Sequence, residues 1–388
     1  MPETNHTHYD VIIIGAGSIG TPAAFFLARN GVKTLVIDRA ASVGQESNKR
    51  AIGGIRATHS DPAKIRLCLR SIDIFSTWQE TYGDDIEWYA GGYVFVAYRE
   101  REEKILKELL VKQHSFGLNI HWLDKKQLLE VVPDLNPNDL LGGTYSPEDG
   151  SASPMLAIHA FYRHARRLGA EFHFHETIEN FTLKNGEIKA VHTNRATYTA
   201  DIIINAAGGH ARQVGELAGL DLPVFPDSHE AAITEPVTRF LHPMIVDIRP
   251  APGSSNFYFY QHLTGQIVFC ITPSPNIWGT DTEETSQFLP MVSRRMIEVM
   301  PRLKHIRVRR TWRGLYPMTP DGFPIIGYAQ NPRNMLLAVG MCGQGFMLGP
   351  GVGELLSRLV LNRTEPEDEI ILQILSPQRQ FAGQELLK

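Results

Sequence analysis

The sequence predicts a two-domain α/β protein, with a mainly parallel sheet in one domain and an antiparallel sheet in an inserted α+β domain. Three observations predict it. A glycine-rich turn joins a β-branched strand to a helix near the start of the chain. Short alternating strands dominate residues 223–313, and a strand followed by a helix returns after residue 313. With 388 residues, 43% of them hydrophobic, the chain is long enough for two packed domains.

The first elements read as a strand, a helix and a second strand. Residues 9–14 form a β-branched run typical of a buried strand. Residues 18–30 are rich in Ala, Phe and Leu and predict a helix that Gly31 ends, and residues 33–37 predict the next strand. Such a βαβ unit pairs its two strands in parallel. This is the beginning of a Rossmann-like domain.

The spacing of apolar residues, every second residue in strands and every third or fourth in helices, predicts the later elements. We expect helices at 61–82, 100–116, 153–168, 285–300 and 349–360, and strands at 93–98, 201–205, 257–260, 266–272 and 335–339. Residues 133–154 read as loop-rich. We therefore assign residues 1–85, 150–220 and 314–388 to the Rossmann-like domain. Residues 86–149 and 221–313 are assigned to the inserted, substrate-binding domain.

The turn after the first strand, Gly15-Ala16-Gly17-Ser18-Ile19-Gly20, fits the pattern G-x-G-x-x-G. Alone it is a weak signal, but here it follows a strand, opens a helix and precedes an acid, Asp38, at the end of the next strand. The first glycine permits the tight turn, the second lets the backbone approach a pyrophosphate, and the third lets helix and strand pack. Asp38 would accept hydrogen bonds from ribose hydroxyls. An ordinary turn with a charged strand end is the alternative.

Two further turns indicate a long dinucleotide. The chain passes from Gly44 and Ser47 to the pair Gly53-Gly54 and then leaves the regular βα pattern that an NAD dehydrogenase would continue. A second close-approach turn, Ala206-Ala207-Gly208, ends a late strand, and a third, 340–345, opens the last helix. Either of these two alone is as often a plain turn. Together the three loops suit FAD.

Composition excludes several other classes. The formal net charge is −4 without a long run of one sign, which gives no case for nucleic acid. Cys68, Cys270 and Cys342 are widely separated, so no metal cluster is expected, and three cysteines without a recognisable signal sequence fit the cytoplasm. The uncharged runs 11–28 and 334–353 approach the length of a membrane span, but their glycines favour strand–turn–helix units instead.

Several blocks of sequence resemble the D-amino-acid-oxidase superfamily of flavoproteins, and the resemblance covers nearly the whole chain. It rests on 11–38, 47–56, 205–208, 314–327 and 340–353. Within the superfamily the chain looks most similar to the β-subunits of heterotetrameric sarcosine oxidase and dye-linked L-proline dehydrogenase, on the evidence of Gly53-Gly54-Ile55-Arg56 and residues 258–269.

The resemblance implies FAD in an elongated pose, with Ile178 near the adenine and residues 343–346 near the flavin pyrimidine. A helix N-terminus there would favour negative charge on reduced flavin. We expect cofactor contacts from Gly15, Ala16, Gly17, Ser18, Ile19, Gly20, Asp38, Arg39, Ser47, Gly53, Gly54, Ile178, Ala206, Ala207, Gly208, Gly314, Gly343, Gln344, Gly345, Phe346 and Met347. Gly314 stands near the position of the cysteine that bonds FAD in monomeric sarcosine oxidase, so FAD is expected to be non-covalent.

The resemblance also implies oxidation of a small amino acid or secondary amine by hydride transfer from the α-carbon to flavin N5. Arg56 matches the arginine that holds the substrate carboxylate in sarcosine oxidases, and its fork suits a carboxylate. A surface salt bridge is the alternative. Tyr316 replaces an arginine of the glycine-oxidase-like members, so it would donate a hydrogen bond or pack.

Three further side chains are candidates for the substrate pocket. His59 and, more weakly, His229 could line it, although a structural role is more common for a lone histidine. Tyr258 shares a strand face with Tyr260, and that face would cover the flavin or form sheet core.

The electron acceptor and the partners remain open at this level. The oxidases of the family use a lysine of the inserted domain to activate oxygen, and this chain has no lysine between Lys189 and Lys304. We therefore expect a dehydrogenase. A free-standing peroxide-producing oxidase and a non-catalytic flavin-binding electron-transfer subunit are the alternatives. A partner subunit, as in the heterotetrameric relatives, or a homo-oligomer is expected.

Overall fold

The computed structural model describes residues 7–387, and in this part of the chain the strands form two large sheets and one two-stranded pair. The first sheet has the order β17 (Ile325–Tyr328), β18 (Met335–Val339), β11 (Thr197–Asn205), β1 (Thr7–Ile14), β2 (Thr34–Ile37), β8 (Glu171–His173). From β18 to β8 its neighbours are parallel, as expected for a Rossmann-like unit. An antiparallel hairpin, β9 (Ile178–Lys184) and β10 (Glu187–Thr193), joins it through β11.

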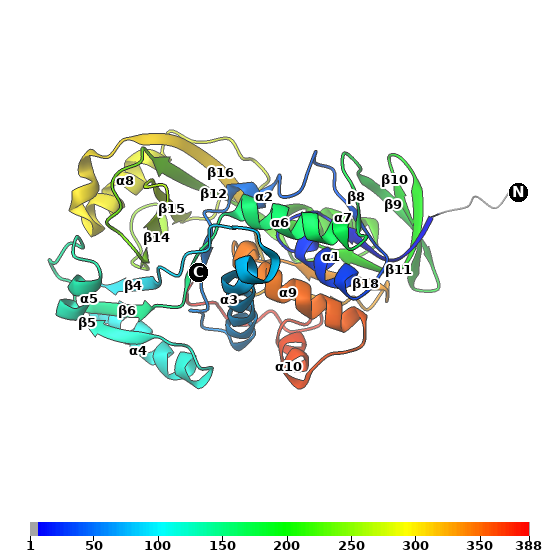
Figure 1. Ribbon diagram of the computed structural model, residues 1–388, viewed down its shortest axis with the longest axis horizontal. Helices are drawn as coiled ribbons and strands as arrows, with labels where there is room; N and C mark the ends of the chain where they lie inside the picture. The colour runs from blue at the N-terminus through cyan, green and yellow to red at the C-terminus, as the bar shows by residue number, and fades with distance from the viewer. Residues whose placement is uncertain (1–6, 388) are drawn as a thin grey trace, which may run out of the picture.

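β1 lies in the middle of this sheet because its side chains are apolar on both faces. Val11 and Ile13 pack into the core shared with the helices, whereas Ile12 and Ile14 pack into the core on the opposite face. Packed together on the first face are α1 (Gly20–Arg29), α3 (Pro62–Tyr82), α6 (Pro154–Arg167) and α9 (Gly345–Val360) (Figure 1).

Helix boundaries follow the capping residues. The Asp61 carboxylate accepts a hydrogen bond from the Lys64 amide, Pro62 opens α3, and Gly83 ends it at φ +80°. Ser153 caps α6 in the same way before Pro154. The helices predicted at 61–82 and 153–168 are confirmed for this reason.

The second sheet has the order β16 (Val308–Met318), β12 (Phe225–Thr234), β15 (Ile267–Pro273), β14 (Ser254–Gln261), β13 (Met244–Asp247), β4 (Tyr93–Ala97), β6 (Gly142–Ser146), β5 (His121–Asp124). Its pairs are antiparallel except β13 with β4. It forms the other half of the molecule with α4 (Glu100–Ser115), α5 (Lys125–Val131), α8 (Phe288–Val299) and the 3-10 turn η2 (Pro301–His305) (Figure 1). The antiparallel sheet of the inserted domain is thus present.

The remaining elements are short. They are α2 (Ser47–Arg50), β3 (Gly54–Ile55) paired with β7 (Gly150–Ser151), η1 (Gly208–His210), α7 (Ala211–Leu217) and α10 (Pro366–Ile374). The described chain ends between the two halves of the molecule (Figure 1).

Two expectations about helix starts were wrong. The helix near the C-terminus begins at Gly345 rather than 349, and α10 follows it. The helix predicted from residue 285 begins at Phe288, because the amide and hydroxyl of Thr285 bind the Glu230 carboxylate instead. Residues 314–318 continue β16 and pair antiparallel with β12.

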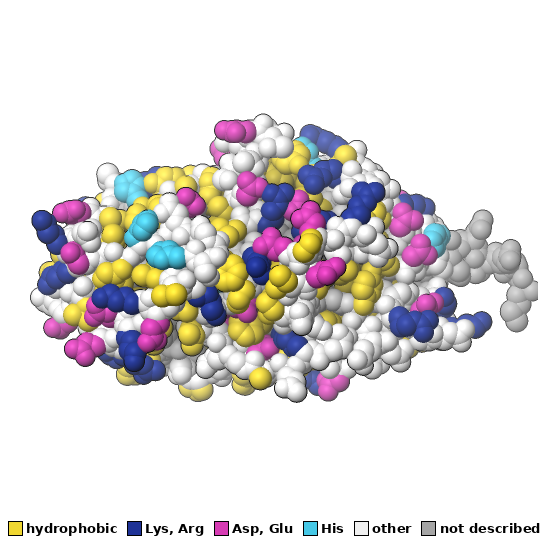
Figure 2. Space-filling model, turned by 90° about the horizontal axis from the view of Figure 1, so that it is seen from below, with side chains coloured by type: hydrophobic (Ala, Val, Ile, Leu, Met, Phe, Trp, Pro, Cys, Tyr) yellow, Lys and Arg dark blue, Asp and Glu magenta, His cyan; other side chains and the backbone are white. Residues whose placement is uncertain are grey.

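The helices of the described residues show no sign of a membrane span, and the face seen in Figure 2 is not dominated by charge of one sign. Within residues 7–387 no helix is both long and apolar enough to cross a bilayer. On the face shown in Figure 2, side chains of both charge signs are intermixed. No metal-ligand group of three or more His, Cys, Asp or Glu occurs among the described residues.

Candidate functional site

A cavity of about 650 Å³ runs between the two sheets. Its size is within the range of small-molecule and cofactor sites. All but two of the side chains and turns predicted to contact cofactor or substrate line it. These are Gly15, Ala16, Gly17, Ser18, Ile19, Asp38, Arg39, Ser47, Gly53, Gly54, Arg56, Ile178, Ala206, Ala207, Gly208, Tyr258, Gly314, Tyr316, Gly343, Gln344, Gly345, Phe346 and Met347.

One end of the cavity is the turn between β1 and α1. Gly15 has φ +107°, and a Cβ there would lie 2.5 Å from the carbonyl oxygen of Ala206, so only glycine fits where these two loops meet. The Asp38 carboxylate accepts hydrogen bonds from the amides of Ala16 (2.7 Å) and Ala40 (2.7 Å). These bonds fix the acid at the strand end, with further lone pairs on its oxygens. Gly20 does not line the cavity; it packs against the end of β1, where a Cβ would lie 3.0 Å from the Ile13 side chain.

The loop before α9 lies beside this turn, because a Cβ at Gly345 would be 3.3 Å from the Ser18 hydroxyl oxygen. Gly343 has φ +82°, and a Cβ there would lie 2.1 Å from the ring of Tyr316. The absence of a side chain at 343 thus lets Tyr316 lie against this loop. The side-chain oxygen Oε1 of Gln344 is buried without a hydrogen-bond partner within the described part of the chain. Such an acceptor indicates a missing donor.

Beyond this loop the cavity extends beneath the second sheet. The hydroxyls of Tyr258 and Tyr316 lie 2.6 Å apart. The imidazole of His229 stacks on the Tyr316 ring, with centroids 3.7 Å apart, and its Nε2 lies 3.0 Å from Oδ2 of Asp227. Burial raises the pKa of Tyr258 well above its usual value, and it also raises the pKa of Tyr316. Both phenols are therefore neutral donors.

The His229 ring is neutral as well. Burial lowers its pKa below the usual value, although the hydrogen bond to Asp227 opposes the shift. Because His229 contributes to the cavity wall, the weaker of the two histidine candidates is the one that reaches the site.

Arg56 lies at the cavity wall, just after Gly54 of β3. Its Nη2 donates to the carbonyl of Leu387 (2.6 Å) and its Nη1 donates to the carbonyl of Thr58. It therefore does not form the surface salt bridge that was the alternative.

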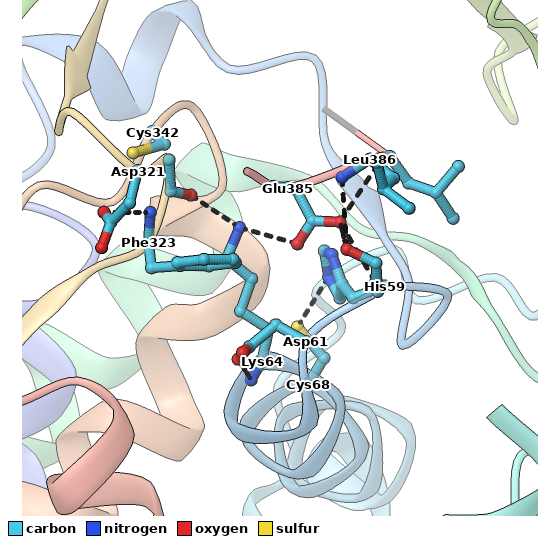
Figure 3. A network of polar contacts seen from close by, with 12 residues as sticks. His59, Asp61, Lys64, Cys68, Asp321, Phe323, Cys342, Glu385 and Leu386 are labelled. Carbon is cyan, nitrogen blue, oxygen red and sulfur yellow. Dashed lines mark hydrogen bonds and ion pairs between the residues drawn. The ribbon is translucent and has the colours of Figure 1, made fainter. Parts of the chain in front are cut away.

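His59, by contrast, is not among the cavity-lining residues. Its side chain is fully buried, and its Nδ1 lies 3.3 Å from the Arg56 Nη1. On the other side of the ring, Nε2 lies 3.4 Å from the Cys68 sulfur (Figure 3). The expectation that His59 contacts a ligand gives way to the structural alternative, because the turn at 57–60 directs the ring toward α3.

Sequence reasoning missed several residues of the second sheet. Tyr93, Met244, Val246, Cys270 and Thr272 line the cavity from β4, β13 and β15. Tyr93 alternates with the buried Val94, and Cys270 alternates with Phe269 and Ile271. Alternation with a period of two divides the side chains of a strand between the two faces of the sheet. It does not predict which face packs against the core and which faces a ligand.

The residues fit FAD. The N-termini of α1 and α9 both face the cavity without a side-chain cap, so their amides are available to anionic groups. At Gly17 a Cβ would meet no protein atom within 4 Å, although this residue stands in the close-approach turn. The α1 terminus and Asp38 would hold the adenosine and pyrophosphate, and the α9 terminus would hold the flavin.

Comparisons with known proteins agree with an FAD site. The model of the family "FAD dependent oxidoreductase" matches residues 10–359. Among curated relatives, human mitochondrial dimethylglycine dehydrogenase is 24% identical over 94% of this chain and 44% of its own length. Glycine oxidase of Bacillus subtilis (strain 168) is 24% identical over 93% of this chain and 95% of its own. Sarcosine oxidase subunit beta of Arthrobacter sp is 26% identical, covering 91% and 87%.

Among solved structures, L-proline dehydrogenase from P. horikoshii superposes with a TM-score of 0.87 at 30% identity, covering 93% of this chain and 95% of that one. The chain spans less than half of the dimethylglycine dehydrogenase but nearly all of the other proteins compared. Taken with the cavity and its two open helix termini, the family match over residues 10–359 shows that the chain belongs to the FAD-dependent oxidoreductase family and is a flavoprotein.

Proposed function

We propose that the chain oxidises a small amino acid or secondary amine at its CH–NH bond, with FAD in the long cavity. When bound, FAD supplies the acceptor for the hydride that leaves the substrate carbon. One observation carries the proposal: the cavity is continuous from the β1–α1 turn to the chamber formed by Arg56, Tyr258 and Tyr316. The relatives named for glycine, sarcosine, dimethylglycine and L-proline support this substrate class.

Arg56 is the proposed ligand of the substrate carboxylate. A guanidinium has five N–H donors, and the bonds to the carbonyls of Thr58 and Leu387 use only part of them. These bonds also fix the plane of the fork. Little screening by water is expected because the Arg56 side chain is buried.

The two tyrosines would complete the chamber. One of their two hydroxyl protons is used in the bond that joins them. The other O–H lies within reach of the Cys270 sulfur, a weak acceptor, and would turn from it to donate to a substrate oxygen. Met244 and Val246 add apolar wall, which excludes water from the reacting carbon. His229 supports Tyr316 from behind through ring stacking and is held by Asp227.

Anaerobic titration of the FAD-loaded protein with a panel of L-, D- and N-methyl amino acids tests the proposal. We expect bleaching of the flavin absorbance by at least one small amino acid, and loss of that bleaching for Arg56→Met at the same substrate concentration. A protein that holds FAD but is bleached by none of the panel would instead be an electron-transfer subunit.

We further propose that the enzyme is a dehydrogenase with poor use of oxygen. The oxidases that the chain resembles use a lysine beside the flavin to help superoxide form. The described residues that line the cavity include no lysine, and the cation of the chamber, Arg56, is assigned to the substrate carboxylate. Stopped-flow mixing of the reduced protein with air-saturated buffer should therefore give slow reoxidation. Fast reoxidation with stoichiometric peroxide would show an oxidase.

A partner subunit is proposed on the likeness to the protein named sarcosine oxidase subunit beta. Native mass spectrometry of the complex isolated from its source is the direct test, and a homo-oligomer or a monomer are the other outcomes.

A further inference from the structure

A segment near the end of the chain, Glu385–Leu387, lies directly behind the cavity wall. Leu387 is fully buried among residues of the second sheet, in one cluster with Tyr93, Phe95 and Met244. Tyr93 and Met244 also line the cavity. The segment thus reaches from the helices of the first domain into the sheet that covers the substrate chamber.

The segment is held by a buried carboxylate. Glu385 pairs with Lys64 of α3 at 3.1 Å, and both side chains are completely buried (Figure 3). Oε1 of Glu385 also accepts hydrogen bonds from the Ser60 amide and hydroxyl and from the Leu387 amide. Burial by itself would raise the pKa of the Glu385 carboxyl. The positive charge of Lys64 outweighs this effect and holds the pKa below its usual value, so the carboxylate stays charged.

These contacts converge on Arg56. The carbonyl of Leu387 accepts from the Arg56 Nη2 at 2.6 Å, and Thr58, whose carbonyl accepts from Nη1, belongs to the same turn as Ser60. Thr58 is itself fixed by Asp149, which accepts from its hydroxyl at 2.6 Å. Two carbonyls on different segments therefore define the direction of one guanidinium, and Glu385 holds the position of both segments.

A purely structural role for the segment would need only the burial of Leu387. It would not require a charged pair, because the desolvation of two buried charges offsets most of their attraction and apolar side chains would pack as well. The hydrogen bonds of Glu385, in contrast, fix direction. Direction matters for a fork that recognises a planar carboxylate.

We propose that Glu385 and Leu387 are positioning residues that orient Arg56 for the substrate carboxylate. The inference rests on the proposed function of Arg56 in the cavity. It assigns no contact with substrate to the segment itself. Loss of Glu385 would leave Arg56 in place but free to rotate, so affinity for a carboxylate would fall while the rate of the chemical step changed little.

The test measures ligand binding, so that it does not depend on turnover. The FAD-loaded wild-type protein and the variants Glu385→Gln, Glu385→Asp and Leu387→Ala are titrated with cyclopentanecarboxylate and with its neutral analogue cyclopentanecarboxamide. Binding is followed by the visible flavin spectrum and by calorimetry. We expect Glu385→Gln to weaken carboxylate binding about tenfold, equivalent to one charge-assisted hydrogen bond, and to leave carboxamide binding within about twofold.

Asp368→Asn is the matched control. The buried Asp368 carboxylate pairs with the partly exposed Arg358 between α9 and α10, so the same carboxylate-to-amide change is made away from Arg56. It should lower stability without selective loss of carboxylate affinity. Glu385→Asp retains the charge and should recover part of the affinity.

The outcomes separate the two proposals. The positioning role is overturned if Glu385→Gln weakens the binding of the carboxylate and of the carboxamide equally. It is also overturned if both Glu385→Gln and Leu387→Ala bind the carboxylate as tightly as the wild type does. If the wild-type protein binds the carboxylate no better than the carboxamide, then Arg56 does not hold a carboxylate, and the positioning role falls with it. If the selective loss is seen but no amino acid reduces the flavin, the proposed oxidation fails and the positioning role stands.

Discussion

Gly17→Ala separates the ligand from the fold in the proposed cofactor site. A methyl group at position 17 meets no protein atom within 4 Å. The apoprotein should therefore keep its stability to within about 0.5 kcal/mol, or gain up to about 1 kcal/mol because alanine restricts the unfolded chain. In the FAD complex the same methyl would stand between the start of α1 and the pyrophosphate. Overpacking of this kind costs about 1–3 kcal/mol, which raises the Kd for FAD roughly 5- to 150-fold.

Gly20→Ala is the contrasting variant. A Cβ at position 20 would lie 1.9 Å from the carbonyl oxygen of Gly15, so backbone has to move before any ligand is bound. We expect this variant to lower the Tm of the apoprotein itself.

Two measurements suffice for both glycines. One is thermal unfolding of the apoproteins, and the other is quenching of FAD fluorescence on titration with apoprotein. A Gly17→Ala protein with the wild-type Kd for FAD would refute the placement of the pyrophosphate at this turn. A Gly17→Ala apoprotein with a strongly lowered Tm would show that the free space around residue 17 was misjudged.

Three further predictions concern buried polar groups. Burial raises the pKa of Asp149 from 3.8 to about 6. Its charged form therefore penalises the folded state, and Asp149→Asn should gain up to about 3 kcal/mol relative to wild type as the pH rises from 4 to 7, measured by urea unfolding across that range. A difference that is independent of pH would contradict this. Lys64→Met leaves Glu385 buried without its cation and should cost about 3–5 kcal/mol, whereas the double change with Glu385→Leu should recover most of it; additive losses in the same unfolding assay would argue against the pair. Tyr316→Phe leaves the Tyr258 hydroxyl without its partner and should weaken carboxylate binding by about tenfold, seen in the flavin spectrum, and an unchanged Kd would remove both hydroxyls from the proposed site.

The first βαβ unit was predictable because its signals are local. The β-branched strand, the glycine turn and the acid at the end of the next strand all lie within residues 9–38, and the structure has them as β1, α1 and β2. The three glycine turns were predicted to converge, and they line one cavity.

What the sequence did not predict depends on long-range contacts. Glu385 lies 321 residues from Lys64, and nothing near either residue in sequence indicates a buried pair. In the sequence His59 and His229 are both isolated histidines, the first in a turn and the second just after a turn. The packing of α3 against the 57–60 turn buries the first, whereas pairing of β12 with β16 places the second beside Tyr316.

The cavity described above has walls from residues as far apart as Gly15 and Met347. The N-terminus of the chain leaves the ribosome first, so the dinucleotide turn emerges hundreds of residues before the loop at 343–347 that completes the cavity wall. FAD can stabilise only a state in which both are in place. FAD binding should consequently come late in the folding of the chain. When flavin is scarce in the cell, we expect full-length apoprotein that proteases cut readily, and no partly folded chain with FAD already bound.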